Sequence, residues 1–112
     1  ETKRVPLSKA AFGIVGLETM LPLSLTLYHQ KILSLREVLA AMTYKPADII
    51  REPVGRLKKN ARADLVIIDL NKEWKINPDE FCSKSKNSPY EDTKVKGRAI
   101  KTIVAGQTVY SL

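Results

Sequence analysis

Ala-Asp-Leu-Val-Ile-Ile-Asp-Leu, residues 63–70, carries the strongest fold signal in this chain of 112 residues. Its centre, Leu65–Ile68, is an uninterrupted apolar run that is short and rich in β-branched side chains. Such a run is typical of a strand covered on both faces, whereas a surface helix would place polar residues on every turn. The stretch therefore predicts a buried β-strand.

The residues that follow continue this pattern of short extended segments. We expect a second short strand at Trp74–Ile76 and a single helical turn at Pro78–Phe81. Ser83–Thr93 is polar and contains Asn-Ser-Pro, which is typical of a loop. Two strands, Gly97–Val104 and Thr108–Leu112, should then form a hairpin, because the glycine between them permits the positive φ of a tight turn.

Upstream of Pro53–Gly55 the periodicity becomes helical. Leu17–Gln30 is strongly apolar, with leucines recurring at helical spacing, and predicts a largely buried helix. Pro22 is compatible with this helix if it begins near Glu18 or Thr19, because a proline in the first turn removes an N–H that has no intrahelical partner.

A second helix has a recognisable start. Ser34 followed by Glu37 forms a capping box, in which each side chain accepts a hydrogen bond from the other residue's backbone amide. This helix should end near Tyr44, since Pro46 disfavours helical geometry at the residue before it. Pro46 can itself open a third, short helix over residues 47–50.

Composition limits the class of protein. The chain is 44% hydrophobic, enough to bury a core, and has no apolar run of the roughly 20 residues that cross a bilayer. Cys82 is the single cysteine, so there is no intrachain disulfide, and a reducing, cytoplasmic location is expected. The first residue is not Met, which suggests a piece of a longer protein.

The formal net charge of +7 is concentrated in the second half. A basic surface can bind nucleic acid, but these lysines are dispersed and alternate with apolar residues, as on the solvent face of strands. We therefore expect a solvated surface, with no nucleic-acid or membrane partner. The lysines concerned are Lys72, Lys75, Lys84, Lys86, Lys94, Lys96 and Lys101.

Isolated reactive side chains give little chemistry. His29 has no second metal ligand at helical spacing, whereas zinc needs three or four convergent ligands. Cys82 has no neighbouring histidine to activate it, so a surface thiol is expected. The pair Asp79 and Glu80 resembles a helix start. Glu18 has two interpretations, a helix N-terminal carboxylate or a substrate contact, of which the first is favoured.

Residues 12–16, Phe-Gly-Ile-Val-Gly, form what we call the glycine loop. Glycines allow conformations closed to other residues and let a ligand approach the main chain. The loop runs directly into the first predicted helix, and on this local pattern alone an ordinary connection is the favoured interpretation. The pattern is suggestive of a ligand loop without identifying the ligand.

The chain carries, in this order, the segments AAFGIVGLETMLPLSL, KPADII, GRLKKNARADLVIIDL, EWKI, SKSKNSPY and GRAIKTIVAGQTVY. These segments are similar to the C-terminal part of dihydroorotases of the amidohydrolase superfamily. Two of them, FGIVGLET and SKSKNSPY, point to dihydroorotases in particular, while ARADLVIIDL and IVAGQTVY are shared with hydantoinases and allantoinases. The resemblance covers essentially the whole chain.

This resemblance implies a metal-dependent cyclic-amide hydrolase that interconverts carbamoyl aspartate and dihydroorotate in pyrimidine biosynthesis. In the family, a TIM barrel holds one or two zinc ions, and an aspartate moves protons. None of those metal ligands and catalytic residues matches a position in this chain, so it should be inactive by itself. Ala11, Phe12 and Gly13 match the family's substrate-contacting loop, with Ala11 standing where proline is common.

The resemblance also implies an α+β fragment. Residues 1–54 would supply the substrate loop and the last helices of the TIM barrel, and residues 55–112 the C-terminal strands of the small β-sandwich domain. Such a piece leaves an apolar helix stripe and strand edges uncovered, so we expect it to associate with another chain or with itself. Two alternatives remain open: a hydantoinase- or allantoinase-type enzyme, and a non-catalytic scaffold.

Overall fold

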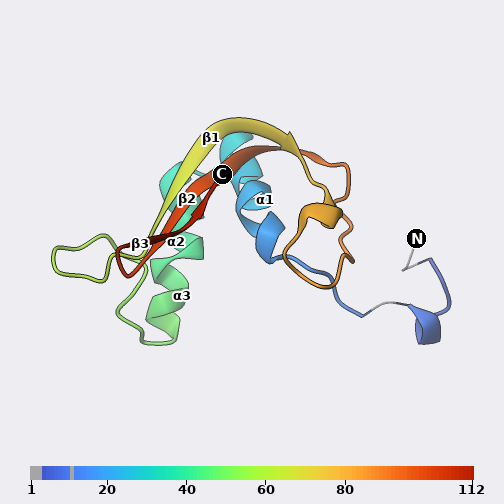
Figure 1. The fold of residues 1–112 in the computed structure, drawn as a ribbon, viewed down its shortest axis with the longest axis horizontal. Helices are drawn as coiled ribbons and strands as arrows, with labels where there is room; N and C mark the ends of the chain where they lie inside the picture. Colours follow the sequence, from blue (N-terminus) through green and yellow to red (C-terminus); the bar gives the residue numbers. More distant parts are fainter. Residues whose placement is uncertain (1–3, 11) are drawn as a thin grey trace.

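The structure, a computed structural model, describes residues 4–10 and 12–112. A three-stranded sheet arches over the first α-helix, and two shorter helices lie toward one end of the arch (Figure 1). At the other end the N-terminal segment extends away from the sheet. In chain order the described elements are η1 (Leu7–Lys9), α1 (Leu17–His29), α2 (Leu35–Met42), α3 (Tyr44–Ile49), β1 (Leu65–Lys75), η2 (Pro78–Glu80), β2 (Lys94–Val104) and β3 (Gln107–Ser111).

The sheet is antiparallel, with β2 between β1 and β3. β1 is one long strand, so the prediction of a separate strand at Trp74–Ile76 was wrong. The register shifts between Asp69 and Glu73, where one carboxylate oxygen of Asp69 accepts hydrogen bonds from the amides of Asn71 and Lys72. This irregularity bends the strand without ending its pairing.

The start of β1 is more exposed than its sequence predicts. Leu65, Val66 and Ile67 are 38%, 51% and 46% exposed, so the prediction of a strand buried on both faces was wrong for this chain. The apolar run does form a strand. However, α1 packs on β2 rather than on the start of β1, and among the described residues nothing covers both faces of this part of β1.

α1 begins at Leu17, with Gly16 as its N-cap residue. Pro22 therefore lies in the second turn, and the expectation that it occupies the first turn was wrong. Its ring is buried, and the hydroxyl of Thr26 donates to its carbonyl. The helix was also predicted to be largely buried, but Leu17 is 89% exposed, because α1 buries one side against the sheet and leaves the other side open.

The capping box at the start of α2 is confirmed. The Glu37 amide donates to the Ser34 hydroxyl, and the Ser34 amide donates to the Glu37 carboxylate. α2 ends at Met42, and the backbone turns at Thr43, with φ of −128° and ψ of −98°, before α3 begins at Tyr44. Pro46 is thus the third residue of α3, still within the first turn that a proline tolerates.

The later predictions agree with the structure apart from their bounds. β2 begins at Lys94, three residues before the predicted start, and Ala105 and Gly106 form the hairpin turn, both with positive φ. A small core lies at the η2 end of the sheet, built from Ile76, Phe81 and Val95. Within the described residues, no helix has the length and apolar character needed to span a membrane.

Candidate functional site

The glycine loop projects from the body of the protein just before α1. Gly13 has a φ of +59°, a left-handed conformation that glycine adopts without strain. Phe12 is 98% exposed, and an added Cβ at Gly13 would meet no atom within 4 Å. Ala11, the third predicted substrate contact, lies outside the described residues. The loop is therefore open to solvent, and its shape depends on the contacts that hold its base.

Asn87 holds the base of the glycine loop. Its side-chain amide donates to the Gly13 carbonyl at 2.7 Å, and its own backbone carbonyl accepts from the Val15 amide at 3.0 Å. The two bonds fall on either side of Ile14, so they fix both the position and the rotation of the short segment between them. Sequence reasoning about single residues missed Asn87, although it lies in the SKSKNSPY segment.

A second link joins the same two regions. Both carboxylate oxygens of Glu18 accept backbone hydrogen bonds, one from Cys82 at 3.1 Å and one from Ser83 at 3.3 Å. Glu18 is in the first turn of α1, which supports its interpretation as a helix N-terminal carboxylate. It also binds α1 to residues 82–87, which we call the clamp segment.

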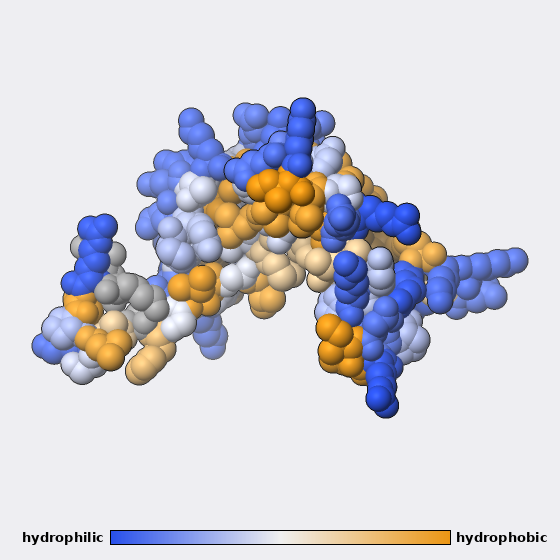
Figure 2. Space-filling view, turned by 180° about the vertical axis from the view of Figure 1, so that it is seen from behind, coloured by the Kyte–Doolittle hydropathy of each residue, from blue (hydrophilic) through white to orange (hydrophobic). Residues whose placement is uncertain are grey.

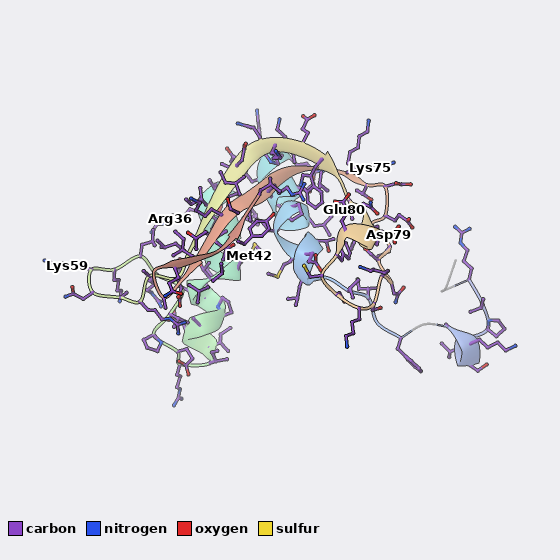
Figure 3. The ribbon with its side chains drawn as sticks, in the orientation of Figure 1. Arg36, Met42, Lys59, Lys75, Asp79 and Glu80 are labelled. Atoms are coloured by element: carbon purple, nitrogen blue, oxygen red, sulfur yellow. The ribbon has the colours of Figure 1, made fainter. Side chains whose placement is uncertain are left out.

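The clamp segment is fixed from its other side by η2 and a lysine. The Lys86 ammonium donates to the Phe81 carbonyl at 2.6 Å and to the Asp79 carbonyl at 3.3 Å. Asp79 and Glu80 lie in the first turn of η2, as predicted, beside the lower end of α1 (Figure 3). Asn77, which the sequence analysis missed, caps this turn by accepting from the Asp79 amide.

A cleft of about 880 Å³ opens beside these contacts. Its walls come from the start of α1, from η2 and from one face of the sheet, and they are mainly apolar. Trp74 lies on this face, where its indole N–H donates to the Gly97 carbonyl at 3.1 Å and Arg98 stacks 4.5 Å from its ring centroid. The cleft gives the site a large apolar wall with few charged groups.

His29 and Cys82 are the remaining candidates from the sequence analysis. His29 is the last residue of α1, with its ring 5.1 Å from that of Tyr28, and Cys82 is an exposed free thiol. Across residues 4–10 and 12–112, histidine, cysteine, aspartate and glutamate side chains form no group of three that could hold a metal ion.

Comparison with known proteins assigns this arrangement to a family. The family model described as "Amidohydrolase family" matches residues 9–109. The chain belongs to the amidohydrolase family. This amidohydrolase chain is 61% identical to a dihydroorotase of Wolbachia sp. subsp. Drosophila simulans (strain wRi) and 63% identical to one of Wolbachia sp. subsp. Brugia malayi (strain TRS). Each match covers 98% of the chain and 25% of the relative, so the chain spans about a quarter of the length of these proteins.

Two solved hydantoinase structures share its fold. An L-hydantoinase (dihydropyrimidinase) from Arthrobacter aurescens superposes with a TM-score of 0.84 at 37% identity, over 93% of this chain and 24% of that one. A D-hydantoinase gives a TM-score of 0.85 at 22% identity and supports the fold alone. In both matches this chain again corresponds to about a quarter of a larger protein.

Proposed function

We propose that this chain is part of a dihydroorotase, which interconverts carbamoyl aspartate and dihydroorotate. The observation that carries the proposal is the identity of 61% and 63% to dihydroorotases over nearly the whole chain, against 37% to the L-hydantoinase. The contact between Gly13 and Asn87 supports it further. That contact joins the two segments, FGIVGLET and SKSKNSPY, whose sequences point to dihydroorotases in particular.

We infer that the chain combines two structural regions of the full protein. Residues 1–54 would supply the substrate loop and the last barrel helices, and residues 55–112 strands of the small β-domain. The surface area supports this: the chain exposes 8813 Å², whereas a compact monomer of its mass exposes about 6200 Å². Apolar side chains gather on the outside of the molecule in separate patches (Figure 2). The excess would be covered by the rest of the protein.

The start of the glycine loop, together with the preceding Ala11, is the proposed substrate contact. Ala11, Phe12 and Gly13 would form one wall of the substrate site, with the main chain at Gly13 approaching the ligand closely because no side chain intervenes. The exposure of Phe12 and the positive φ of Gly13 support this assignment.

The zinc that the family resemblance implies does not fit the residues of this chain. As noted for the described residues, no group of three candidate ligands exists, so no step of the reaction is assigned to a metal held here. We propose that the ligands and the proton-transferring aspartate lie elsewhere in a full-length, cytoplasmic protein. The 112-residue chain by itself would then show no turnover.

The test is a substrate comparison with the full-length protein. Turnover is measured with dihydroorotate, hydantoin and allantoin, before and after treatment with a chelator. Dihydroorotate turnover that chelation abolishes supports the proposal. Preference for hydantoin or allantoin would instead support the alternative, a hydantoinase- or allantoinase-type enzyme. The TM-score of 0.84 to the L-hydantoinase favours that alternative. No turnover with any of the three would favour a non-catalytic scaffold.

A further inference from the structure

The clamp segment connects the glycine loop to the small core. Phe81 is buried in that core with Ile76 and Val95, and its carbonyl accepts a hydrogen bond from the Lys86 ammonium at 2.6 Å. Asn87 follows Lys86 directly, so its backbone is held close to a rigid point. The two hydrogen bonds between Asn87 and the glycine loop, one donated and one accepted by Asn87, therefore hold this exposed loop at a fixed place relative to the core.

The chemistry of the Asn87 side chain suits this task. A carboxamide can donate to a carbonyl, and the Gly13 carbonyl is the group that it meets, at 2.7 Å. The donated bond sets the plane of the peptide that follows Gly13, while the backbone bond from Val15 sets its distance from the clamp segment. An aspartate of the same size could not donate and would bring a negative charge against the Gly13 carbonyl.

We propose that Asn87 is a positioning residue for substrate binding, which orients the Phe12–Gly13 main chain through its contact with Gly13. The inference rests on the proposed function, in which the glycine loop contacts the substrate. Asn87 itself does not touch the reacting atoms in this arrangement. It acts through the loop, and Glu18 supports it by binding the other end of the clamp segment to α1.

Asn87→Asp in the full-length protein tests the proposal, with Asn87→Ala as a second variant in case the charge prevents folding. Two readouts are combined: hydrogen exchange of peptides covering residues 12–17, and the steady-state constants for dihydroorotate. We expect faster exchange in residues 12–17 and a rise in KM of about five- to tenfold with a smaller change in kcat. A purely structural defect would instead lower kcat and the melting temperature together and leave KM unchanged.

Asn60→Asp is the matched control, because it makes the same chemical change in the exposed loop between α3 and β1. The neighbouring Lys59 lies in this loop, well away from Asp79 and Glu80 (Figure 3). The control should leave both exchange at residues 12–17 and KM unchanged.

If hydrogen exchange at residues 12–17 is unchanged in both Asn87 variants, Asn87 does not hold the glycine loop and the proposal is overturned. If exchange is faster but KM is unchanged, Asn87 holds the loop but has no role in substrate binding. If the wild type turns over hydantoin or allantoin instead of dihydroorotate, the proposed function fails, and KM for that substrate then decides the role of Asn87. If the wild type turns over none of the three substrates, the proposed function and the role of Asn87 in substrate binding are both rejected. Hydrogen exchange then tests only whether Asn87 holds the glycine loop.

Discussion

At the scale of single residues, backbone conformation matters more here than reactive side chains. Gly13 and Gly97 both have a positive φ, but an added Cβ would meet no atom within 4 Å at Gly13, whereas at Gly97 it would meet the Leu25 side chain. The sequence marks both simply as glycine. Their surroundings give the two positions different consequences on substitution.

Gly13→Ala in the full-length protein should weaken substrate binding. Alanine in a left-handed conformation costs roughly 1–2 kcal/mol, and an exposed loop can relieve that strain by changing shape. We expect KM for dihydroorotate to rise with little change in melting temperature. Phe12→Ala should act in the same direction by removing a side chain that is 98% exposed on the loop.

Gly106→Ala provides the control for Gly13→Ala. Gly106 also has a positive φ and no atom within 4 Å of an added Cβ, but it lies in the turn between β2 and β3. The same strain there should leave KM unchanged. An unaltered KM in both Phe12→Ala and Gly13→Ala would show that the glycine loop is not the substrate contact.

The capping box at α2 gives a pH-dependent prediction. The Ser34 hydroxyl, and next its backbone amide, hold the pKa of Glu37 below its ordinary value of 4.5, with a smaller contribution from Lys45. Because the folded pKa is lowered, the stabilisation is fully present above pH 4.5 and is lost as the pH falls through the folded pKa. Hydrogen exchange of residues 35–39 should be faster in Glu37→Gln than in wild type at pH 7, and this difference should vanish at low pH.

Ser34→Ala is the companion variant to Glu37→Gln. Loss of an N-cap serine costs about 1 kcal/mol, which corresponds to roughly fivefold faster exchange where α2 opens locally. A difference between Glu37→Gln and wild type that persisted well below the folded pKa would contradict the electrostatic account.

At the scale of elements, the packing of α1 on β2 is the main tertiary contact between helix and sheet. Leu25 is fully buried and lies against Gly97 of β2, whose φ is +105°. A methyl group at residue 97 would overlap the Leu25 side chain. A glycine within a strand is often a site of close approach, and here it admits a helix side chain.

Gly97→Ala should therefore destabilise the protein strongly. Overpacking and left-handed strain together cost about 2–5 kcal/mol, and the backbone shift would also disturb the bond from Trp74 to the Gly97 carbonyl. The melting temperature of the full-length protein is the measurement. Gly106→Ala, with comparable φ but open space, should lower it much less; equal effects would mean that contact with Leu25 contributes nothing.

At the scale of the whole molecule, the chain is extended rather than compact. Its radius of gyration is 16.3 Å, whereas a compact domain of this length has about 13 Å. Exposed apolar side chains lie on separate elements, including Leu17 of α1, Ile67 of β1 and Ile49 of α3. Such a surface is typical of a part that packs against further protein.

The isolated 112-residue chain should consequently self-associate. Light scattering over a concentration series is expected to show dimers or larger species, because β1 offers an apolar strand and exposed backbone edge groups. Ile67→Lys should reduce association by placing a charge on that strand, while Lys59→Arg, a surface change that preserves charge, should not. A monomer at the highest concentrations would contradict the prediction.

The sequence determined the local structure of this protein largely by itself. The Ser34 and Glu37 capping box, the turn at Gly106 and the strand in Leu65–Ile68 were all predictable, because each depends on neighbours in the chain. The bounds were less predictable: Pro22 lies buried inside α1, although a proline there leaves the carbonyl four residues earlier without its intrahelical donor. The family was also recognisable from segments spread along the whole chain.

Only the tertiary structure decided which of these segments meet. Nothing local to Asn87 indicates that it donates to Gly13, 74 residues earlier in the chain, or that Glu18 accepts from Cys82. The prediction that β1 is buried was also wrong for this chain. An apolar strand indicates that its side chains need packing partners, but it does not indicate which part of the protein supplies them. Long-range hydrogen bonds and burial depend on the three-dimensional path of the backbone, and for that reason local pattern could propose the glycine loop but could not show what holds it.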